Sequence, residues 1–534
     1  MIKSKLNNVF SPLFLISSAI AALFAIWAVI APNQMGDMMT IAQQYLAVTT
    51  GWLVLFLPFF FIVLLLYLGF HPKYRDYVIG GPGVKPDYTT FSWIAMLFAA
   101  GIGVGIVYFA VNSALYAYFL SPSGMMSGAS TTETIRNALG LAFYQWGPQA
   151  WAIFSISGLV VGYFAFQHKT KYLPGEALAF GFKDRRWAAP AGKVMNIMAC
   201  VCAALTIATS VGLGSGQLAA GTFLILGIDN TPAFAPFVVL FLLFVATAAS
   251  SILPTEKGMR VIGNWNVYIF LGLMVFVMFF GPTRFIFETI FQTIGAFLSI
   301  AIPINFELFL LAEEPSYVYD WNVVTMQWWL SWTPFMAVFI ASISRGRTLK
   351  QFSLATISVP ALFMLLWLST FGGIALLDMF QGEGTIAGHA MEHAHLTFFA
   401  ILDVLPMTQL TIIVTIALLF LSLVTTYTSC SLSLSRMTDR EGLNTSPARA
   451  FIWCLLMALI AVAAIAAQLL GGNNALNAIR ALATTIAFPY IFFFMLTISA
   501  FIKQFRNDFA QPQTAVKAEP VLKPAAEGPQ ERSE

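Results

Sequence analysis

The sequence predicts an all-α polytopic membrane protein with 12 transmembrane helices, and three observations support this fold class. The chain of 534 residues is 59% hydrophobic and only 10% charged, whereas soluble domains carry about 25% charged residues. Apolar runs of about 20 residues, the length at which a helix crosses a bilayer, recur along almost the whole chain. Lys and Arg gather in alternate connections between these runs, as in proteins that cross a membrane repeatedly.

The expected spans are separated by short polar connections. They cover residues 13–32, 50–70, 89–119, 133–166, 191–226, 232–253, 262–282, 321–345, 350–377, 408–436, 448–470 and 476–503. With both termini in the cytoplasm, all but three of the 27 Lys and Arg residues lie on the cytoplasmic side, the exceptions being Arg136, Arg284 and Arg480. Because positive residues are retained on that side, this bias predicts a multi-pass protein of the cytoplasmic (inner) membrane with both termini inside.

Spans three to seven and eight to twelve form two groups of five. An odd number of spans inverts the second group relative to the first, which predicts a five-plus-five inverted repeat with two extra N-terminal helices. Glu288 and Gln292 interrupt the apolar pattern between the groups, so an interfacial helix is expected there. The expected order is a cytoplasmic tail (1–12), two peripheral spans (13–70), the first repeat (89–282), the outer interfacial segment (283–320), the second repeat (321–503) and a disordered cytoplasmic tail (504–534).

The third span contains three glycines at alternate positions, Gly101, Gly103 and Gly105. Each interior glycine costs about 1 kcal/mol of helix stability relative to alanine, so we expect the helix to break here. Broken backbone at membrane depth is tolerated where it lines a cavity or is packed in protein. Its free carbonyl groups can coordinate a cation, and its free N–H groups can hold a carboxylate. The alternative is close packing of helices, which glycine also permits.

Tryptophan gathers in the middle of two spans. The eighth span has Trp328, Trp329 and Trp332, and the fourth has Trp146 and Trp151, with Phe154 three residues further on. Tryptophan usually lies at membrane interfaces. Several of them in mid-span therefore predict an aromatic cage for a ligand cation. For the fourth span alone, an interfacial aromatic belt is the alternative.

The tenth span ends in the hydroxyl-rich sequence LSLVTTYTSCSLSLSRMT, which includes Thr425 and Thr426. Such hydroxyls most often bond their own backbone or join helices, but they can also ligate a sodium ion. Spans three, four, eight and ten have no Asp, Glu, Lys or His in their middle. Because a proton-coupled carrier normally needs a titratable group near the midplane, sodium coupling fits this chain better.

Other chemistries find less support in the sequence. The four cysteines lie in hydrophobic spans without metal-site spacing, so we expect buried thiols. His389 and His393 have the i,i+4 spacing of zinc ligands, but they lie in an expected outer loop, where packing or solvation is the simpler interpretation. The net charge of +3 reflects the cytoplasmic bias and predicts no nucleic-acid partner. An intramembrane enzyme would need a catalytic constellation, and a sensor would need a soluble output domain; neither is evident.

The segments W-W-L-S-W-T-P-F with I-S-R-G-R-T, AAGIGVGI, W-x-x-x-x-W-A-I and ATSVGLG together resemble the betaine/choline/carnitine transporter (BCCT) family over most of residues 50–505. This resemblance implies a LeuT-like inverted-repeat fold and sodium-coupled symport into the cell of a betaine-type compatible solute, commonly by a homotrimer. No cofactor other than the coupling sodium ion is expected. Choline uptake, uptake of a taurine- or ectoine-like substrate, and sodium-independent carnitine-type exchange are the alternatives.

The resemblance also implies roles for individual residues. Trp146, Trp151, Phe154 and Trp329 would surround the trimethylammonium group, with Trp328 and Trp332 beside them as gating or pathway residues. The backbone of Gly101, Gly103 and Gly105 would face the substrate carboxylate. A sodium site would combine the carbonyl groups of Ala99 and Ile102 with the hydroxyl groups of Thr425 and Thr426, and Phe335 would lie near a second ion site.

Four departures from the family pattern fall at the site or its rim. Phe154 stands where a tyrosine is frequent, and Met326 replaces an aromatic residue. Asn112-Ser113 stands where the family usually has Glu-Pro, and Ser422 where phenylalanine is common. These departures bear on the substrate more than on the fold. The three intact glycines resemble those of betaine carriers more than those of choline or carnitine carriers.

Overall fold

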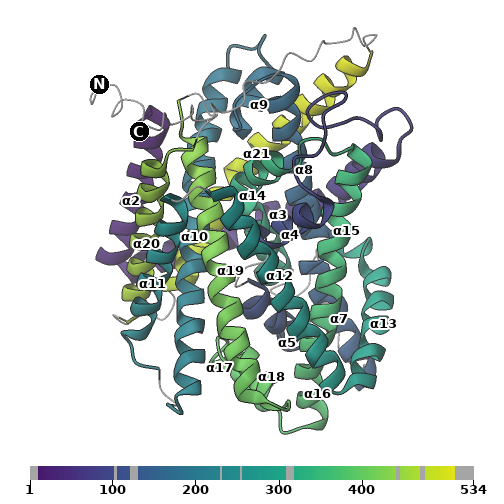
Figure 1. The fold of residues 1–534 in the computed structure, drawn as a ribbon, viewed down its shortest axis with the longest axis vertical. Coiled ribbons are helices and arrows are strands. Elements are labelled where there is room, and N and C mark those ends of the chain that lie inside the picture. The colour runs from purple at the N-terminus through teal and green to yellow at the C-terminus, as the bar shows by residue number, and fades with distance from the viewer. Residues whose placement is uncertain are drawn as a thin grey trace, which may run out of the picture.

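The computed structural model describes residues 10–101, 105–120, 130–228, 231–252, 255–307, 318–440, 445–469 and 475–510. It is a bundle of helices (Figure 1). Within these ranges the one β-pairing is an isolated bridge between Val78 and Thr348. The helices are α2 (Pro12–Ile30), α3 (Pro32–Phe70), α4 (Thr90–Gly101), η1 (Ile106–Ala110), α5 (Val111–Leu120), α7 (Thr131–Trp146), α8 (Pro148–Gln167), α9 (Pro174–Gly181), α10 (Ala188–Ile225), α11 (Ala235–Ile252), α12 (Thr255–Phe280), α13 (Thr283–Ile300), η2 (Pro303–Asn305), η3 (Val318–Val323), α14 (Val324–Ile343), α15 (Leu349–Trp367), η4 (Leu368–Gly372), α16 (Gly373–Gln381), α17 (Thr385–Glu392), α18 (Thr397–Asp403), α19 (Thr408–Met437), α20 (Pro447–Leu469) and α21 (Ala475–Ala510).

The all-α polytopic fold class is confirmed. Ten candidate spans among the described residues are long and apolar enough to cross a membrane, and two shorter apolar helices, Ile106–Phe119 and Ala235–Ser251, coincide with the third and sixth expected spans. The total of twelve spans stays a prediction. Helix α3 is longer than the expected span 50–70, because Pro32 begins it directly after α2. Proline favours this first helical position, where its missing N–H is not needed.

Helices of the two groups of five pack in matching pairs. Helix α4 packs on α12 as α14 packs on α21, and α10 packs on α21 as α19 packs on α12. Likewise, α8 packs on α14 as α15 packs on α4, and α10 packs on α14 as α19 packs on α4. Replacing each helix by its counterpart in the other group, five spans earlier or later in the chain, converts one member of each pair into the other. This is the contact pattern of a five-plus-five inverted repeat.

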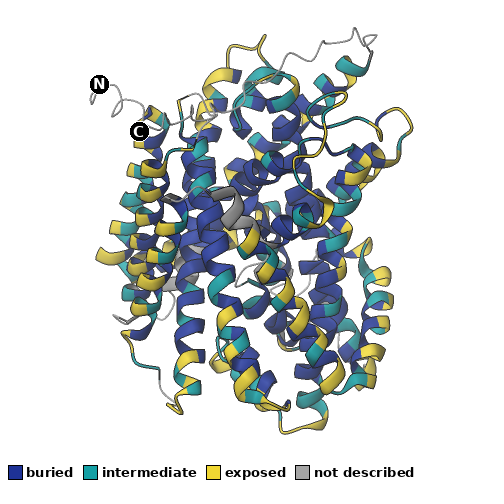
Figure 2. Ribbon diagram, viewed as in Figure 1, coloured by how far each residue is buried: buried dark blue, intermediate teal, exposed yellow. Residues whose placement is uncertain are grey.

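Helix α13 is amphipathic, as expected for the segment between the two groups. Thr289 Oγ1 donates to the carbonyl group of Ser369 in η4 (3.1 Å), and Ser369 Oγ donates to Thr293 Oγ1 (3.1 Å). The opposite face, with Phe291 and Leu298, is exposed. Figure 2 shows this alternation of buried and exposed residues on α13, whereas the central helices are mostly buried. The placement of α13 along a membrane surface stays a prediction.

The C-terminal boundary differs from the expected one. We expected a disordered tail from residue 504, but α21 continues to Ala510. The extra turns are stabilised by aromatic burial, since the ring centroids of Phe505 and Phe509 lie 5.2 and 5.1 Å from that of Tyr74. Asp508 accepts a hydrogen bond from Tyr163 at the end of α8. Residues 511–534 lie outside the described residues.

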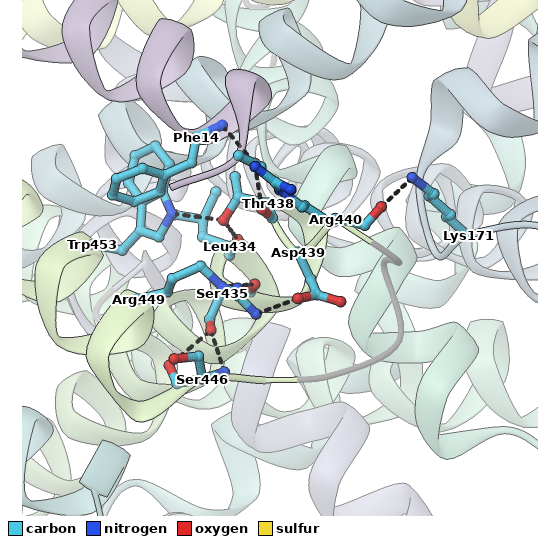
Figure 3. Close-up of polar contacts among 11 residues, drawn as sticks. Phe14, Lys171, Leu434, Ser435, Thr438, Asp439, Arg440, Ser446, Arg449 and Trp453 are labelled. Carbon is cyan, nitrogen blue, oxygen red and sulfur yellow. Dashed lines mark hydrogen bonds and ion pairs between the residues drawn. The ribbon is translucent and has the colours of Figure 1, made fainter. Parts of the chain in front are cut away.

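A polar network joins the end of α19 to the start of α20 (Figure 3). It lies on the side of the bundle that carries α9, since Lys171, three residues before α9, donates to the carbonyl group of Arg440. Arg449 is buried and donates to the carboxylate of Asp439 (2.6 Å) and to the carbonyl group of Ser435 (3.1 Å). Trp453 Nε1 donates to Thr438 Oγ1 (3.2 Å). We call this side the α9 end, and the opposite side, which carries α17 and α18 (Figure 1), the α17–α18 end.

Candidate functional site

Four aromatic rings from two different spans meet in the interior of the bundle. The ring centroids of Trp146 and Trp329 are 5.1 Å apart, those of Phe154 and Trp329 are 5.3 Å apart, and those of Trp151 and Phe154 are 5.8 Å apart. All three pairs are edge-to-face and all four side chains are buried. We call Trp146, Trp151, Phe154 and Trp329 the aromatic box. The structure therefore brings together the four rings that the sequence predicted to act together.

A helix break places the box residues. Trp146 is the last residue of α7, and Pro148 begins α8 after the non-helical backbone of Gly147. A Cβ atom at Gly147 would lie 2.4 Å from the carbonyl oxygen of Phe143, so no larger residue fits this turn. Trp151 and Phe154 then follow on one face of α8, and α8 packs against α14, which supplies Trp329. Gly147 thus interrupts the fourth span, which consists of two helices, α7 and α8.

Two of the indole rings are held by hydrogen bonds. Trp146 Nε1 donates to Ser113 Oγ (2.8 Å), and Trp329 Nε1 donates to the carbonyl oxygen of Gln145 (2.9 Å). Trp151 Nε1 is buried and has no hydrogen-bond partner among the described residues. A buried polar group without a partner costs free energy. The box therefore combines two fixed rings with one indole donor that a bound molecule could satisfy.

The glycines of the third span lie against the box. A Cβ atom at Gly101 would lie 2.7 Å from Cη2 of Trp151, and one at Gly105 would lie 3.4 Å from the ring of Trp146. Glycine therefore allows the backbone to approach both indole rings. Gly103 and Ile102 lie outside the described residues. The π-helix η1 follows Gly105 directly, and π-helical turns frequently occur at functional sites.

Trp328 and Trp332 form a separate aromatic row. Their ring centroids are 6.1 Å apart, and that of Phe335 is 5.5 Å from that of Trp332. Because an α-helix turns about 100° per residue, Trp328 and Trp332 share one face of α14 and Trp329 points elsewhere. The structure therefore separates the predicted pathway residues from the box. The predicted role of Phe335 near a second ion site stays a prediction.

The hydroxyl groups of the predicted sodium site lie on α19, which packs against α4. Thr425 Oγ1 donates to the carbonyl group of Leu421 (2.7 Å) in its own helix. Thr426 Oγ1 is buried without a partner among the described residues. Ala99 lies in α4, whereas Ile102 is outside the described residues. Because Thr425 donates only its hydroxyl hydrogen, the oxygens of both threonines keep lone pairs that a cation could use, and Thr426 is the one without any partner among the described residues.

Some polar residues near the box escaped prediction. Gln145 Nε2 donates to Asn322 Oδ1 (2.6 Å), so the residue before Trp146 holds η3 as well as the indole ring of Trp329. Ser422 Oγ, a departure noted in the sequence, donates to Asn266 Oδ1 in α12 (3.0 Å). These pairs join residues more than 150 positions apart. The sequence feature that could have indicated such pairs is the presence of amide side chains within apolar spans.

The histidines of the α17–α18 end form no metal site. Among the described residues, no group of three or more His, Cys, Asp or Glu side chains could hold a metal ion. The rings of His393 and His395 are 6.1 Å apart. Burial lowers the pKa of His395, and the neighbouring charges of His393 and His389 lower it further. This histidine is therefore suited to remaining neutral.

Comparison with known proteins places the chain among transporters. The family model described as "BCCT, betaine/carnitine/choline family transporter" matches residues 12–510. The "Probable glycine betaine transporter" of Desulfitobacterium hafniense is 30% identical over 92% of this chain and 97% of its own length. The glycine betaine transporter OpuD of Bacillus subtilis is 30% identical over 96% of this chain and 98% of its own length.

A choline carrier and a solved structure extend the comparison. The high-affinity choline transport protein of Escherichia coli K12 is 28% identical over 96% of this chain and 75% of its own length. The crystal structure of MhsT in complex with L-phenylalanine covers 78% of this chain and 89% of its own, at 13% identity and a TM-score of 0.48. That structural likeness is too distant to carry an argument.

Proposed function

Because this chain belongs to the betaine/carnitine/choline transporter family, we propose that it is a sodium-coupled symporter that carries a betaine-type solute into the cell. Family membership makes the chain a multi-pass membrane transporter of small solutes and not an enzyme. Relatives are named as betaine, choline or ectoine transporters. The observation that carries our choice among these solutes is the aromatic box with its adjoining glycines.

The aromatic box would hold the positive head group of the solute. Each aromatic face contributes about 0.5–2 kcal/mol to binding a desolvated cation. The sequence provides no carboxylate in the middle of the spans that form the site. A quaternary ammonium group, which donates no hydrogen bonds, suits such a pocket, and Trp328 and Trp332 would line the route to it.

The glycine segment favours a zwitterion over choline. The backbone near Gly101 and Gly105 approaches the rings of Trp151 and Trp146. Free N–H groups of a broken helix bind carboxylates. A betaine has a carboxylate one short chain away from its ammonium group, whereas choline has a hydroxyl group there. The same binding geometry would therefore hold both ends of a betaine.

Thr426 supports the sodium part of the proposal. Its buried hydroxyl oxygen has no partner among the described residues, on a helix that packs against α4. A sodium ion there would take the hydroxyl groups of Thr425 and Thr426 together with the carbonyl groups of Ala99 and Ile102. Such a site would join α4 and α19, which belong to different repeats, and so would link ion binding to their relative movement.

The basic residues support an orientation with the α9 end and both termini in the cytoplasm. The α9 end carries Lys171, Arg347 and Arg449 among other positive residues. Transport would then proceed by alternate opening of the α17–α18 end and the α9 end around a fixed central site. Assembly as a homotrimer in the inner membrane stays a prediction.

Uptake into proteoliposomes tests the solute site. We expect Trp329→Leu to raise the apparent KM for glycine betaine by about 10-fold, because one aromatic face of the box is lost. Trp265→Leu is the matched control, since this tryptophan is exposed on α12. An equal, small effect of both substitutions would contradict the proposed site.

The sodium dependence needs its own experiment. We expect uptake to require an inward sodium gradient, and Thr426→Ala to raise the sodium concentration for half-maximal uptake more than Thr426→Ser does. Undiminished uptake without sodium would refute the coupling. A thermal-shift screen of betaine, choline and ectoine, with and without sodium, identifies the solute, because a ligand that binds the folded state raises its apparent stability.

A further inference from the structure

Asn112 and Ser113 are adjacent polar residues in the first turn of α5, and both are buried. They follow η1, the π-helix that begins after Gly105. The two side chains make contacts with different parts of the molecule.

Ser113 contacts the aromatic box. Its hydroxyl oxygen accepts a hydrogen bond from Trp146 Nε1 (2.8 Å), and its hydroxyl hydrogen is donated to the carbonyl group of Phe109 (2.8 Å). The intrahelical bond fixes the direction of the hydroxyl group. Its two lone pairs then limit the directions from which the indole N–H of Trp146 can donate. A proline at this position could not accept this bond.

Asn112 contacts the α17–α18 segment (Thr385–Asp403). Its side-chain amide donates to the carbonyl group of Ala394 (3.0 Å), between α17 and α18, and to that of Tyr108 (2.6 Å). One turn further along α5, the hydroxyl group of Tyr116 donates to the carbonyl group of Ala390 (3.0 Å). Helices α17 and α18 both pack against α5, and α18 also packs against η1. The segment is thus bonded to the same turn that holds Trp146.

We propose that Asn112 and Ser113 form a coupling turn, in which placement of the Trp146 ring and closure of the α17–α18 segment depend on each other. Both are positioning residues, because they act through Trp146 and through the segment. Two adjacent residues of one helical turn move together, so a solute that moves the ring also moves the anchor of the segment. By thermodynamic linkage, closure of the segment must equally favour the ring position that binds solute.

A double-mutant cycle tests the coupling and rests on the proposed function. In proteoliposomes, we expect Ser113→Ala and Asn112→Ala each to raise the apparent KM for glycine betaine about five-fold, with little change in the maximal rate. In the double variant, the KM should rise by much less than the product of the two single-variant increases, since both substitutions break the same connection. Ser113→Thr, which keeps the hydroxyl group, should restore the wild-type KM. If the two single-variant increases in KM multiply in the double variant, the proposal is overturned.

Cysteine labelling provides a second readout that needs no solute. Ala387 is buried on α17, so Ala387→Cys reacts with a membrane-impermeant maleimide only when the segment opens. We expect Ser113→Ala and Asn112→Ala each to raise this labelling rate about five-fold, and the double variant to raise it no further. Met391→Cys, which is exposed on the same helix, should react at one rate in every background.

The controls separate the possible failures. Ser251 on α11 is also buried and donates only within its own helix, to the carbonyl group of Thr247 (2.8 Å). Ser251→Ala should therefore change neither the KM nor the labelling rate. If Ser113→Ala leaves labelling at the Ser251→Ala level, the coupling turn is refuted. If the wild-type protein carries none of the solutes, the proposed function fails, while the labelling result still decides the coupling.

Discussion

The two ends of the bundle are held closed by different chemistry. At the α9 end, Arg347 lies buried over the ring of Trp93, with Cζ 4.6 Å from the ring centroid, and Arg449 pairs with Asp439 (Figure 3). At the α17–α18 end, Asn112 and Tyr116 of α5 bind the α17–α18 segment through neutral hydrogen bonds.

This difference has an energetic consequence. Breaking a buried charge pair leaves a desolvated charge and costs about 3–5 kcal/mol, whereas a neutral hydrogen bond contributes about 1 kcal/mol. We therefore expect the α17–α18 end to open more readily than the α9 end when no solute is bound.

The largest effect is expected from Asp439→Asn, which removes the carboxylate charge that pairs with the buried guanidinium group of Arg449. We expect a loss of about 3 kcal/mol of stability, seen as a lower apparent melting temperature of the purified protein. Asp76→Asn is the matched control, because its partner Arg75 is exposed and such pairs contribute little. Equal melting temperatures for the two variants would remove the distinction between the ends.

A smaller loss is expected from Arg347→Lys. The planar guanidinium group covers Trp93 and donates to the carbonyl group of Tyr88 (2.6 Å) and to Thr90 Oγ1 (3.1 Å). Lysine keeps the charge but cannot reproduce this fork of donors, so we expect a loss of about 2 kcal/mol. The apparent melting temperature measures it, with Arg345→Lys as the control. A variant as stable as that control would show that charge alone holds the α9 end.

Acid should weaken the α17–α18 end through His395. Its pKa is lowered in the folded protein, first by burial and then by His393 and His389. The unfolded chain therefore binds more protons than the folded one below about pH 6.5. Stability is fully present above that value and is lost as the pH falls below it. The reactive thiolate is lost in acid, so the labelling rate of Ala387→Cys is divided by that of the exposed Met391→Cys at each pH. We expect this ratio to rise between pH 7.5 and 5.5, and His395→Gln to reduce the rise.

At the α9 end, His168 has different neighbours from those of His395. Burial lowers the pKa of His168, but the carboxylate of Asp508, 3.0 Å from Nε2, opposes this effect. Acid should therefore affect the α17–α18 end more than the α9 end. If the labelling rate of Ala387→Cys responds to pH equally in the His395→Gln background, a titratable group other than His395 causes the response.

Periodicity and residue chemistry predicted the fold class and an aromatic cage in the middle of the spans, whereas the four members of the aromatic box followed from the family resemblance. Tryptophan usually lies at membrane interfaces, so the three tryptophans in the middle of the eighth span indicated a ligand cage, whereas the fourth span alone left an interfacial belt open. The glycines of the third span were informative for the same reason, because Gly101 leaves room only for the ring of Trp151.

Contacts between distant segments could not be predicted. The partner of Trp146 Nε1 is Ser113, and that of Ser422 is Asn266. Any of many serines and asparagines satisfies such a bond equally well, and local sequence does not select among them. The extension of α21 past residue 503 likewise depends on aromatic packing against Tyr74, which the local Pro- and Ala-rich composition of the tail conceals.

The smallest effect is expected from Tyr116→Phe, and it tests the weaker end most directly. The substitution removes the hydrogen bond to the carbonyl group of Ala390 but keeps the edge-to-face contact with Trp321, whose centroid is 4.8 Å away. We expect a loss of about 1 kcal/mol, and thus labelling of Ala387→Cys about five-fold faster. If the α17–α18 end depended mainly on aromatic packing, the labelling rate would stay unchanged and Tyr116→Leu would raise it instead. A rise in Tyr116→Phe shows that single neutral hydrogen bonds hold this end closed, which is the property that a solute-controlled opening requires.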